Sequence, residues 1–219
     1  MNSATARAAL LLAAMIMGSS TATADSLWLG AKVGTMGLGL EGTWRPIPWL
    51  DLRVGANAYD YDETGFQAGV NYDGTLHLDS YYATANLLFP ASPFRFTAGG
   101  YSNGNEVRLT SAENGSYDIG GTPYSAAEVG TLRSNTSFDD VAPYLGLGFD
   151  FSLFGQVGMS LDLGVLWQGD PVVTLTADGT MADDPDFQSQ LDAERSELEE
   201  EFDVLKAYPV VSLGFNVNF

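Results

Sequence analysis

The segment Val157–Trp167, VGMSLDLGVLW, alternates apolar residues with small or polar ones at a period of two. Every odd position is apolar, whereas the even positions through Gly164 carry Gly, Ser and Asp. Because successive side chains of a strand point to opposite faces, the pattern predicts a strand with one apolar and one polar face. The same alternation recurs in Leu50–Ala58, Phe94–Gly99 and Tyr144–Phe151. The chain is therefore expected to be all-β.

Two environments produce such strands: a soluble sandwich, and an outer-membrane barrel whose apolar face meets lipid. The polar faces favour the barrel, because Gly, Ser, Asn and Thr dominate them and charges are isolated. A water-facing surface would carry many Lys and Glu side chains, whereas small residues with few charges suit a crowded barrel interior. We predict a membrane-spanning, antiparallel up-and-down β-barrel.

The first segment has the features of an export signal. Arg7 gives a positive start, Ala8–Met17 is an apolar core, and Ala22-Thr23-Ala24 is an A-x-A cleavage site. We expect a signal peptide over 1–24, removed in the mature protein, and a barrel domain over 25–219 with net charge −20. The longest uncharged stretch of that domain, Ser80–Phe94, contains two prolines, so no transmembrane helix is expected.

Composition excludes several classes of function. The 219 residues carry 28 acidic and 9 basic side chains, and an excess of this sign argues against nucleic acid as a partner. The absence of cysteine excludes disulfides, thiolate metal sites and thiol nucleophiles. A single histidine excludes a histidine-rich metal centre.

The last strand gives the most specific signal. Val211, Leu213, Phe215, Val217 and Phe219 are apolar at every second position, and Phe219 ends the chain. Here the sequence resembles the small outer-membrane β-barrel proteins of Gram-negative bacteria, the eight-stranded barrels of the OmpA transmembrane-domain and OmpW type. The resemblance implies a cell outer-membrane location, a monomer surrounded by lipid and lipopolysaccharide, and barrel-assembly machinery that reads Phe219. It covers the whole of 25–219 but transfers no catalytic motif.

Eight strands are predicted, with short and long connections in strict alternation, as periplasmic turns and extracellular loops alternate in such barrels. The strands are Leu27–Val33, Met36–Trp44, Leu50–Tyr61, Thr75–Leu88, Phe94–Leu109, Val141–Phe151, Gln156–Trp167 and Val204–Phe219. The long loops are Asp62–Gly74, Thr110–Asp140 and Gln168–Asp203. At Gly34-Thr35 the alternation changes phase, which indicates either a tight turn or a bulge; the even strand count of bacterial barrels favours the turn. Aromatic girdles are expected from Trp28, Trp44, Trp49, Phe89, Phe94, Phe154 and Tyr208.

One segment, Asp184–Leu205, is predicted to be an amphipathic acidic helix inserted before the last strand. Pro185 suits its first turn after an Asp cap, and apolar residues recur at helical spacing. This stripe consists of Phe187, Leu191, Leu198, Phe202 and Leu205. The interval 169–206 carries 12 acidic and 2 basic residues, so it cannot enter lipid. We expect the helix outside the membrane, with its stripe packed on loop residues around the barrel mouth.

The strand phase places a nearly balanced set of charges in the barrel interior: Lys32, Glu41, Asp51, Arg53, Arg95, Asp150 and Asp162. Buried charges persist by pairing, so a filled, salt-bridged interior is expected. For catalysis, His77 and Asp79 share a strand face, but no motif brings Ser111, Ser125 or Ser137 to them. Acidic loop residues lack the spacing of a dedicated Ca²⁺ site: Asp60, Asp62, Glu63, Asp73, Asp139 and Asp140.

No catalytic, cofactor-binding or metal-binding residue is therefore assigned, and no cofactor is expected. The leading hypothesis is a non-enzymatic outer-membrane barrel with a structural or surface-interaction role. The alternative is a narrow porin for small, cationic solutes. A third hypothesis is a lipid-modifying enzyme that uses His77.

Overall fold

The computed structural model describes residues 27–218 except 68–69, 112–115 and 155. The predicted export signal and the terminal Phe219 lie outside the described residues. Eight antiparallel strands close into a barrel, in the spatial order β1, β2, β3, β4, β5, β10, β11, β13 and back to β1. These strands are β1 (Leu27–Gly34), β2 (Gly37–Ile47), β3 (Leu50–Gln67), β4 (Val70–Leu88), β5 (Phe94–Asn103), β10 (Val141–Phe154), β11 (Val157–Trp167) and β13 (Ala207–Asn218). The predicted fold class is confirmed.

The first turn settles the strand count. Gly34 pairs with Gly37 across a two-residue turn, and Gly37 adopts a φ of +89°, which favours glycine. The tight turn is therefore confirmed over the bulge. The predicted strand start at Met36 is wrong, because Met36 belongs to the turn and is buried on the lumen side.

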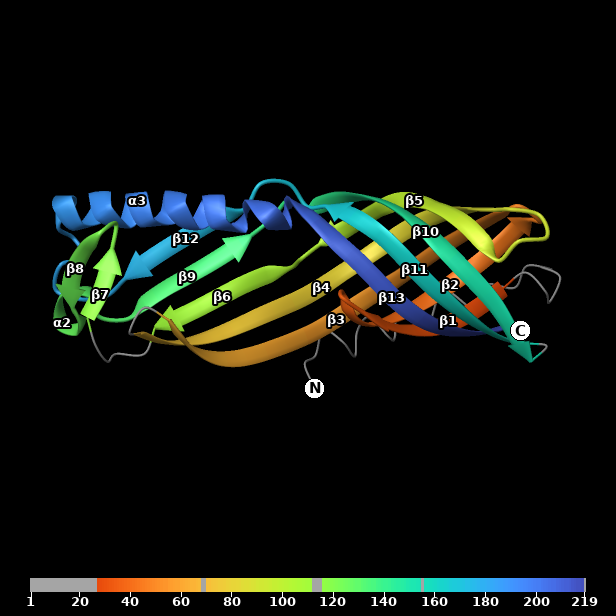
Figure 1. The fold of residues 1–219 in the computed structure, drawn as a ribbon, viewed down its shortest axis with the longest axis horizontal. Helices are drawn as coiled ribbons and strands as arrows, with labels where there is room; N and C mark the ends of the chain where they lie inside the picture. Colours follow the sequence, from red (N-terminus) through yellow and green to blue (C-terminus); the bar gives the residue numbers. More distant parts are fainter. Residues whose placement is uncertain (1–26, 68–69, 112–115, 155, 219) are drawn as a thin grey trace, which may run out of the picture.

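Beyond one end of the barrel the sheet continues as an extension (Figure 1). Strands β3 and β4 stay paired from Ala58 out to Gln67, so the predicted loop Asp62–Gly74 is wrong. Three further strands extend the sheet from β4: β6 (Glu106–Ser111) pairs with β4, β9 (Leu132–Ser137) pairs with β6, and β12 (Val172–Ala177) pairs with β9. The predicted strand Phe94–Leu109 ends at Asn103, because β6 leaves the barrel there to pair with the outer half of β4.

A small apolar core holds the far end of the extension together. It is formed by the hairpin β7 (Ser116–Ile119) and β8 (Thr122–Ser125), the short helix α2 (Ala126–Val129) and the helix α3 (Pro185–Phe202). Phe187 and Leu191 of α3 are buried there against Ile119 and Val129. The predicted acidic helix before the last strand is thus confirmed, and Asp184 caps it by accepting from the amides of Asp186 and Phe187.

The predicted position of the helical stripe needs correction. Its buried half packs on β12 and on the β7–β8 hairpin, far from the barrel mouth, as Figure 1 shows. The remaining stripe residues Leu198, Phe202 and Leu205 are only half-buried. The 3-10 helix η2 (Asp203–Lys206) connects α3 to β13. Sequence periodicity identified the apolar face, but its partner strands lay in segments read as loops.

The outward face of β3 changes from apolar to charged after Ala58. On β3 the outward positions run Leu52, Val54, Ala56 and Ala58, and the next is the exposed Asp60. Eight residue steps from Leu50 to Ala58, each about 3.4 Å at a tilt of about 40°, rise about 21 Å, close to the ~25 Å apolar band of such barrels. The extension therefore begins where the lipid-facing band ends. Among the described residues, no helix combines the length and hydropathy needed to cross a membrane.

Candidate functional site

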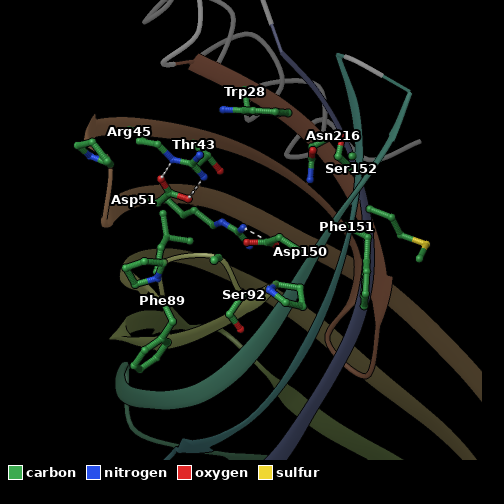
Figure 2. Close-up of a pocket in the computed structure, with 18 residues that line it drawn as sticks. Trp28, Thr43, Arg45, Asp51, Phe89, Ser92, Asp150, Phe151, Ser152 and Asn216 are labelled. Atoms are coloured by element: carbon green, nitrogen blue, oxygen red, sulfur yellow. Dashed lines mark hydrogen bonds and ion pairs between the residues drawn. The ribbon is translucent and has the colours of Figure 1, made fainter.

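The barrel interior opens at the end opposite the extension into a vestibule of about 340 Å³. Trp28, Asp51, Asp150 and Asn216 line it together with the β4–β5 turn (Figure 2). The first and last described residues, Leu27 and Asn218, and the turns after β2, β4 and β10 lie at this end, which is the periplasmic one in the predicted topology. The vestibule is therefore the interior space to test for function.

Above the vestibule, charged side chains from six strands form an ion-pair layer across the lumen. The fully buried Arg95 reaches Asp150 at 2.9 Å through Nε and Asp162 at 2.6 Å through Nη2. Arg53 lies 3.5 Å from Asp150, 3.6 Å from Asp162 and 3.7 Å from Glu41. Each arginine thus bridges acidic groups from different strands, which ties opposite walls of the barrel together. Lys32 completes the layer, 4.0 Å from Glu41.

Uncharged polar side chains add hydrogen bonds to the charged groups of this layer. Arg95 also donates through Nη1 to Asn86 at 3.1 Å and to Thr97 at 2.9 Å. Tyr82 donates to Glu41 at 2.8 Å. Buried charges are tolerated when such hydrogen bonds supplement the ion pairs. The only cavity described at this level measures about 20 Å³, room for about one water molecule.

Lumenal glycines make space for the large side chains. A Cβ added at Gly148 would overlap the guanidinium of Arg95. A Cβ added at Gly146 or Gly164 would overlap the ring of Tyr144. The alternation of glycine with apolar residues in β10 and β11 therefore accommodates specific neighbours inside the barrel.

Toward the extension, an apolar layer closes the lumen above the charges. Its buried residues are Met36, Tyr82, Tyr101, Ala142, Tyr144, Leu166 and Val210. Tyr82 stacks on Tyr101, with ring centroids 4.9 Å apart.

The β1–β2 turn is fixed over this layer by Thr35. Its amide donates to the carbonyl of Val211 at 2.9 Å, and its hydroxyl donates to the carbonyl of Pro209 at 2.9 Å. Tyr208 in turn donates to the carbonyl of Thr35 at 2.8 Å. The lumen is thus filled by side chains and covered by a bonded turn.

The sequence prediction of the interior is confirmed for all seven charges, which face the lumen and pair. It missed Arg45, which was assigned to a turn but forms a bidentate pair with Asp51 at 2.7 and 3.0 Å. Two predicted girdle residues also face inward: Trp28 lines the vestibule, and Tyr208 packs on the apolar layer. Trp44, Trp49 and Phe89 are about half exposed at the vestibule end of the barrel, as expected for a girdle.

The proposed catalytic residues are not assembled into a site. His77 Nδ1 contacts Asp60 on the outer face of the extension, one strand away. Ser111 bonds the Tyr117 hydroxyl and the Leu132 amide, and Ser125 caps α2. Ser137 lies two strands from His77 in the same row, about 10 Å away. Within the described ranges, no cluster of three acidic or histidine side chains is arranged to hold a metal ion.

Comparisons with known proteins support the barrel fold. The crystal structure of Acinetobacter baumannii CarO2 matches with a TM-score of 0.63 at 25% identity, covering 89% of this chain and 98% of that chain. The structure of Acinetobacter baumannii CarO matches with a TM-score of 0.61 at 24% identity and the same coverage. No protein-family model and no curated protein sequence matches. The similarity to CarO2 and CarO shows a shared barrel fold.

Proposed function

We propose that this chain is a non-enzymatic outer-membrane barrel that holds a rigid extracellular platform above the membrane, in a structural or surface-interaction role. The observation that carries the proposal is the closed lumen beneath an ordered extension. An ion-pair layer and an apolar layer fill the interior, as side chains do in eight-stranded barrels. A chain that only formed a pore would not need five paired strands outside the membrane.

Further expectations belong to the same proposal. Lipid and lipopolysaccharide surround a monomeric barrel, a cleaved signal peptide directs export, and the assembly machinery reads the strand that ends in Phe219. Similarity to the OmpA transmembrane-domain and OmpW barrels stays a prediction.

A narrow porin is the second candidate, because the vestibule already opens one end of the lumen. Conduction would require the Met36 turn and the apolar layer to move. The lumenal charges give no preference for cations, since four basic and four acidic groups line the described interior. The third candidate, an enzyme that uses His77, has no nucleophile beside that histidine among the described contacts.

Single-channel conductance of the refolded mature protein distinguishes these roles. We expect no steady conductance from the wild type. The matched variant M36A/Y144A, which removes two side chains of the apolar layer, should show brief openings. A stable wild-type conductance that M36A/Y144A does not increase would refute the closed lumen and favour the porin.

A further inference from the structure

The outer half of β3 is an open edge of the extension sheet. Strand β2 pairs with β3 only as far as Ala58, and the first residue of β2, Gly37, lies against Tyr59. From Asp60 to Gln67, β3 pairs with β4 on one side and with no described strand on the other. The opposite border of the sheet, β12, is covered by α3 (Figure 1), so β3 is the edge that a partner can reach.

Four consecutive residues at the start of this edge are exposed, whichever face their side chains lie on. Tyr59 and Tyr61 are 47% and 48% exposed, and Asp60 and Asp62 are exposed as well. In the barrel part of the same strand, inward residues such as Asn57 are buried. The rest of the described chain therefore leaves both faces of this segment uncovered.

The main-chain groups of the two aspartates point toward the open side. The amide of Leu88 donates to the carbonyl of Trp49 at 3.0 Å, which marks these two residues as a hydrogen-bonded pair. The β3–β4 register then runs to the end of β3 without a shift. Bonded and non-bonded pairs alternate in an antiparallel ladder, so odd-numbered residues of β3 bond β4, whereas the amides and carbonyls of Asp60 and Asp62 face away from it. An added strand would find these groups unpaired.

The side chains of this edge alternate between two chemistries. The two aspartates continue the outward face of β3, and the two tyrosines lie on the other face. Thr75 donates to Asp62 at 2.8 Å and His77 contacts Asp60, both from β4, so the edge side of each carboxylate stays available. A strand added here would place one set of its side chains beside the carboxylates and the alternate set beside the tyrosine rings.

Charge decides the kind of partner. A second copy paired at the same edge would bring Asp60 and Asp62 next to the same two residues, and like charges directly opposite destabilise a strand pair. The chain as a whole carries 28 acidic and 9 basic residues, which adds to this repulsion. Basic side chains opposite the aspartates, with β-branched or aromatic ones opposite the tyrosines, would instead form favourable cross-strand pairs.

We propose that the outer edge of β3 binds an extended segment of a partner protein, in which lysine or arginine alternates with apolar residues, as an added strand. This inference rests on the proposed surface-interaction role and specifies its partner chemistry. Main-chain hydrogen bonds to Asp60 and Asp62 would supply affinity, and the alternating side chains would supply specificity. Binding would weaken with salt, because the charges involved are exposed.

The test uses the refolded full barrel in detergent micelles and a synthetic peptide that alternates lysine with valine over about eight residues, the length of the edge from Asp60 to Gln67. Calorimetry measures binding, and hydrogen exchange measures amide protection. We expect new protection at the amides of Asp60 and Asp62. D60N/D62N, which removes two cross-strand ion pairs, should lose about tenfold in affinity. The matched control E197Q/E201Q removes two exposed carboxylates of α3 and should bind as the wild type does.

Two methylated peptides test the main-chain bonds without altering the protein. Residues opposite Asp60 and Asp62 direct their own amides toward β3, because they form the hydrogen-bonded pairs of the added ladder. Methylation of the lysine main-chain nitrogens should therefore abolish binding, whereas methylation of the valine nitrogens should preserve it. Both peptides keep the charge and the side chains.

Several results would overturn the proposal: equal binding of the two methylated peptides, equal binding of a glutamate–valine peptide, unchanged affinity of D60N/D62N, or a peptide-free barrel that dimerises through this edge. A barrel that is closed to ions yet fails to bind the lysine–valine peptide would refute this inference and leave the proposed platform role standing. A barrel that conducts steadily would refute the platform role itself.

Discussion

Replacing Arg95 with leucine should destabilise the barrel more than any surface substitution, because this side chain joins two carboxylates inside the lumen. Arg95 is fully buried and lies 2.9 Å from Asp150 and 2.6 Å from Asp162. It also donates to Asn86 and Thr97. Leucine is smaller and has no donor, so Asp150 and Asp162 would keep only their longer contacts to Arg53.

The magnitude follows from that loss. Removing one partner of a buried ion pair costs about 3–5 kcal/mol, because the remaining charge stays desolvated. Arg53 also reaches both carboxylates, at 3.5 and 3.6 Å, and these longer contacts keep the cost within that range. Arg95→Lys keeps the charge but loses the bridging geometry, so its cost should be intermediate.

The free energy of unfolding is measured by urea titration in lipid vesicles, followed by tryptophan fluorescence and by heat-modified electrophoretic mobility. The matched control is Arg133→Leu, which removes an exposed pair with Asp178 at 2.8 Å and should cost less than about 1 kcal/mol. Equal stabilities of the Arg95→Leu and Arg133→Leu variants would show that the lumenal layer does not stabilise the barrel.

Three further predictions concern the lipid face and the extension. Leu147→Arg should cost about 2–4 kcal/mol in vesicle refolding, whereas Thr176→Arg on the exposed extension should be nearly neutral; equal costs would refute the register. Phe187→Ala should cost about 3–5 kcal/mol and raise hydrogen exchange in β7–β8 but not in β11; faster exchange in β11 would contradict an independent extension. Hydrogen bonds from the Thr131 amide and Arg133 lower the pKa of Asp178, so its stabilisation of the extension is present above about pH 4 and is lost as the pH falls through the lowered pKa. Asp178→Asn should remove this loss of stability at low pH, measured by hydrogen exchange of the extension as a function of pH. An unchanged pH dependence would exclude Asp178 as its source.

The sequence was sufficient to predict the barrel because lipid imposes a strict period on each strand. A register error of one residue would have turned Asp162 and Arg95 into the membrane, so the phase alone located the interior charges. The alternation did not predict the inward orientation of Met36. Its position continues the outward phase of β2, but the turn rotates it inward, and turn conformation is set by Gly37 and by bonds to β13.

The extension was not predicted from the sequence, because lipid does not contact it and therefore imposes no strict period on its strands. Strand β9, LRSNTS, is rich in Ser, Thr and Asn, a composition shared with loops, and β6 and β12 are only six residues long each. Their pairing depends on the edge that β4 exposes once β5 ends at Asn103, a contact between segments distant along the chain. Arg45 was missed for a different reason, because the predicted strand ended at Trp44, whereas β2 continues to Ile47 and brings Arg45 to Asp51 across the turn.

The length of α3 explains how an ordered platform stands on a small barrel. β12 runs outward from the barrel, and α3 returns the chain to β13 (Figure 1). Eighteen helical residues span about 27 Å, so the helix bridges the height of the extension in one rigid element. Its outer half buries Phe187 in the far core, while its acidic face cannot approach lipid. The helix therefore fixes the extension upright and covers the side of β12 that β9 leaves free.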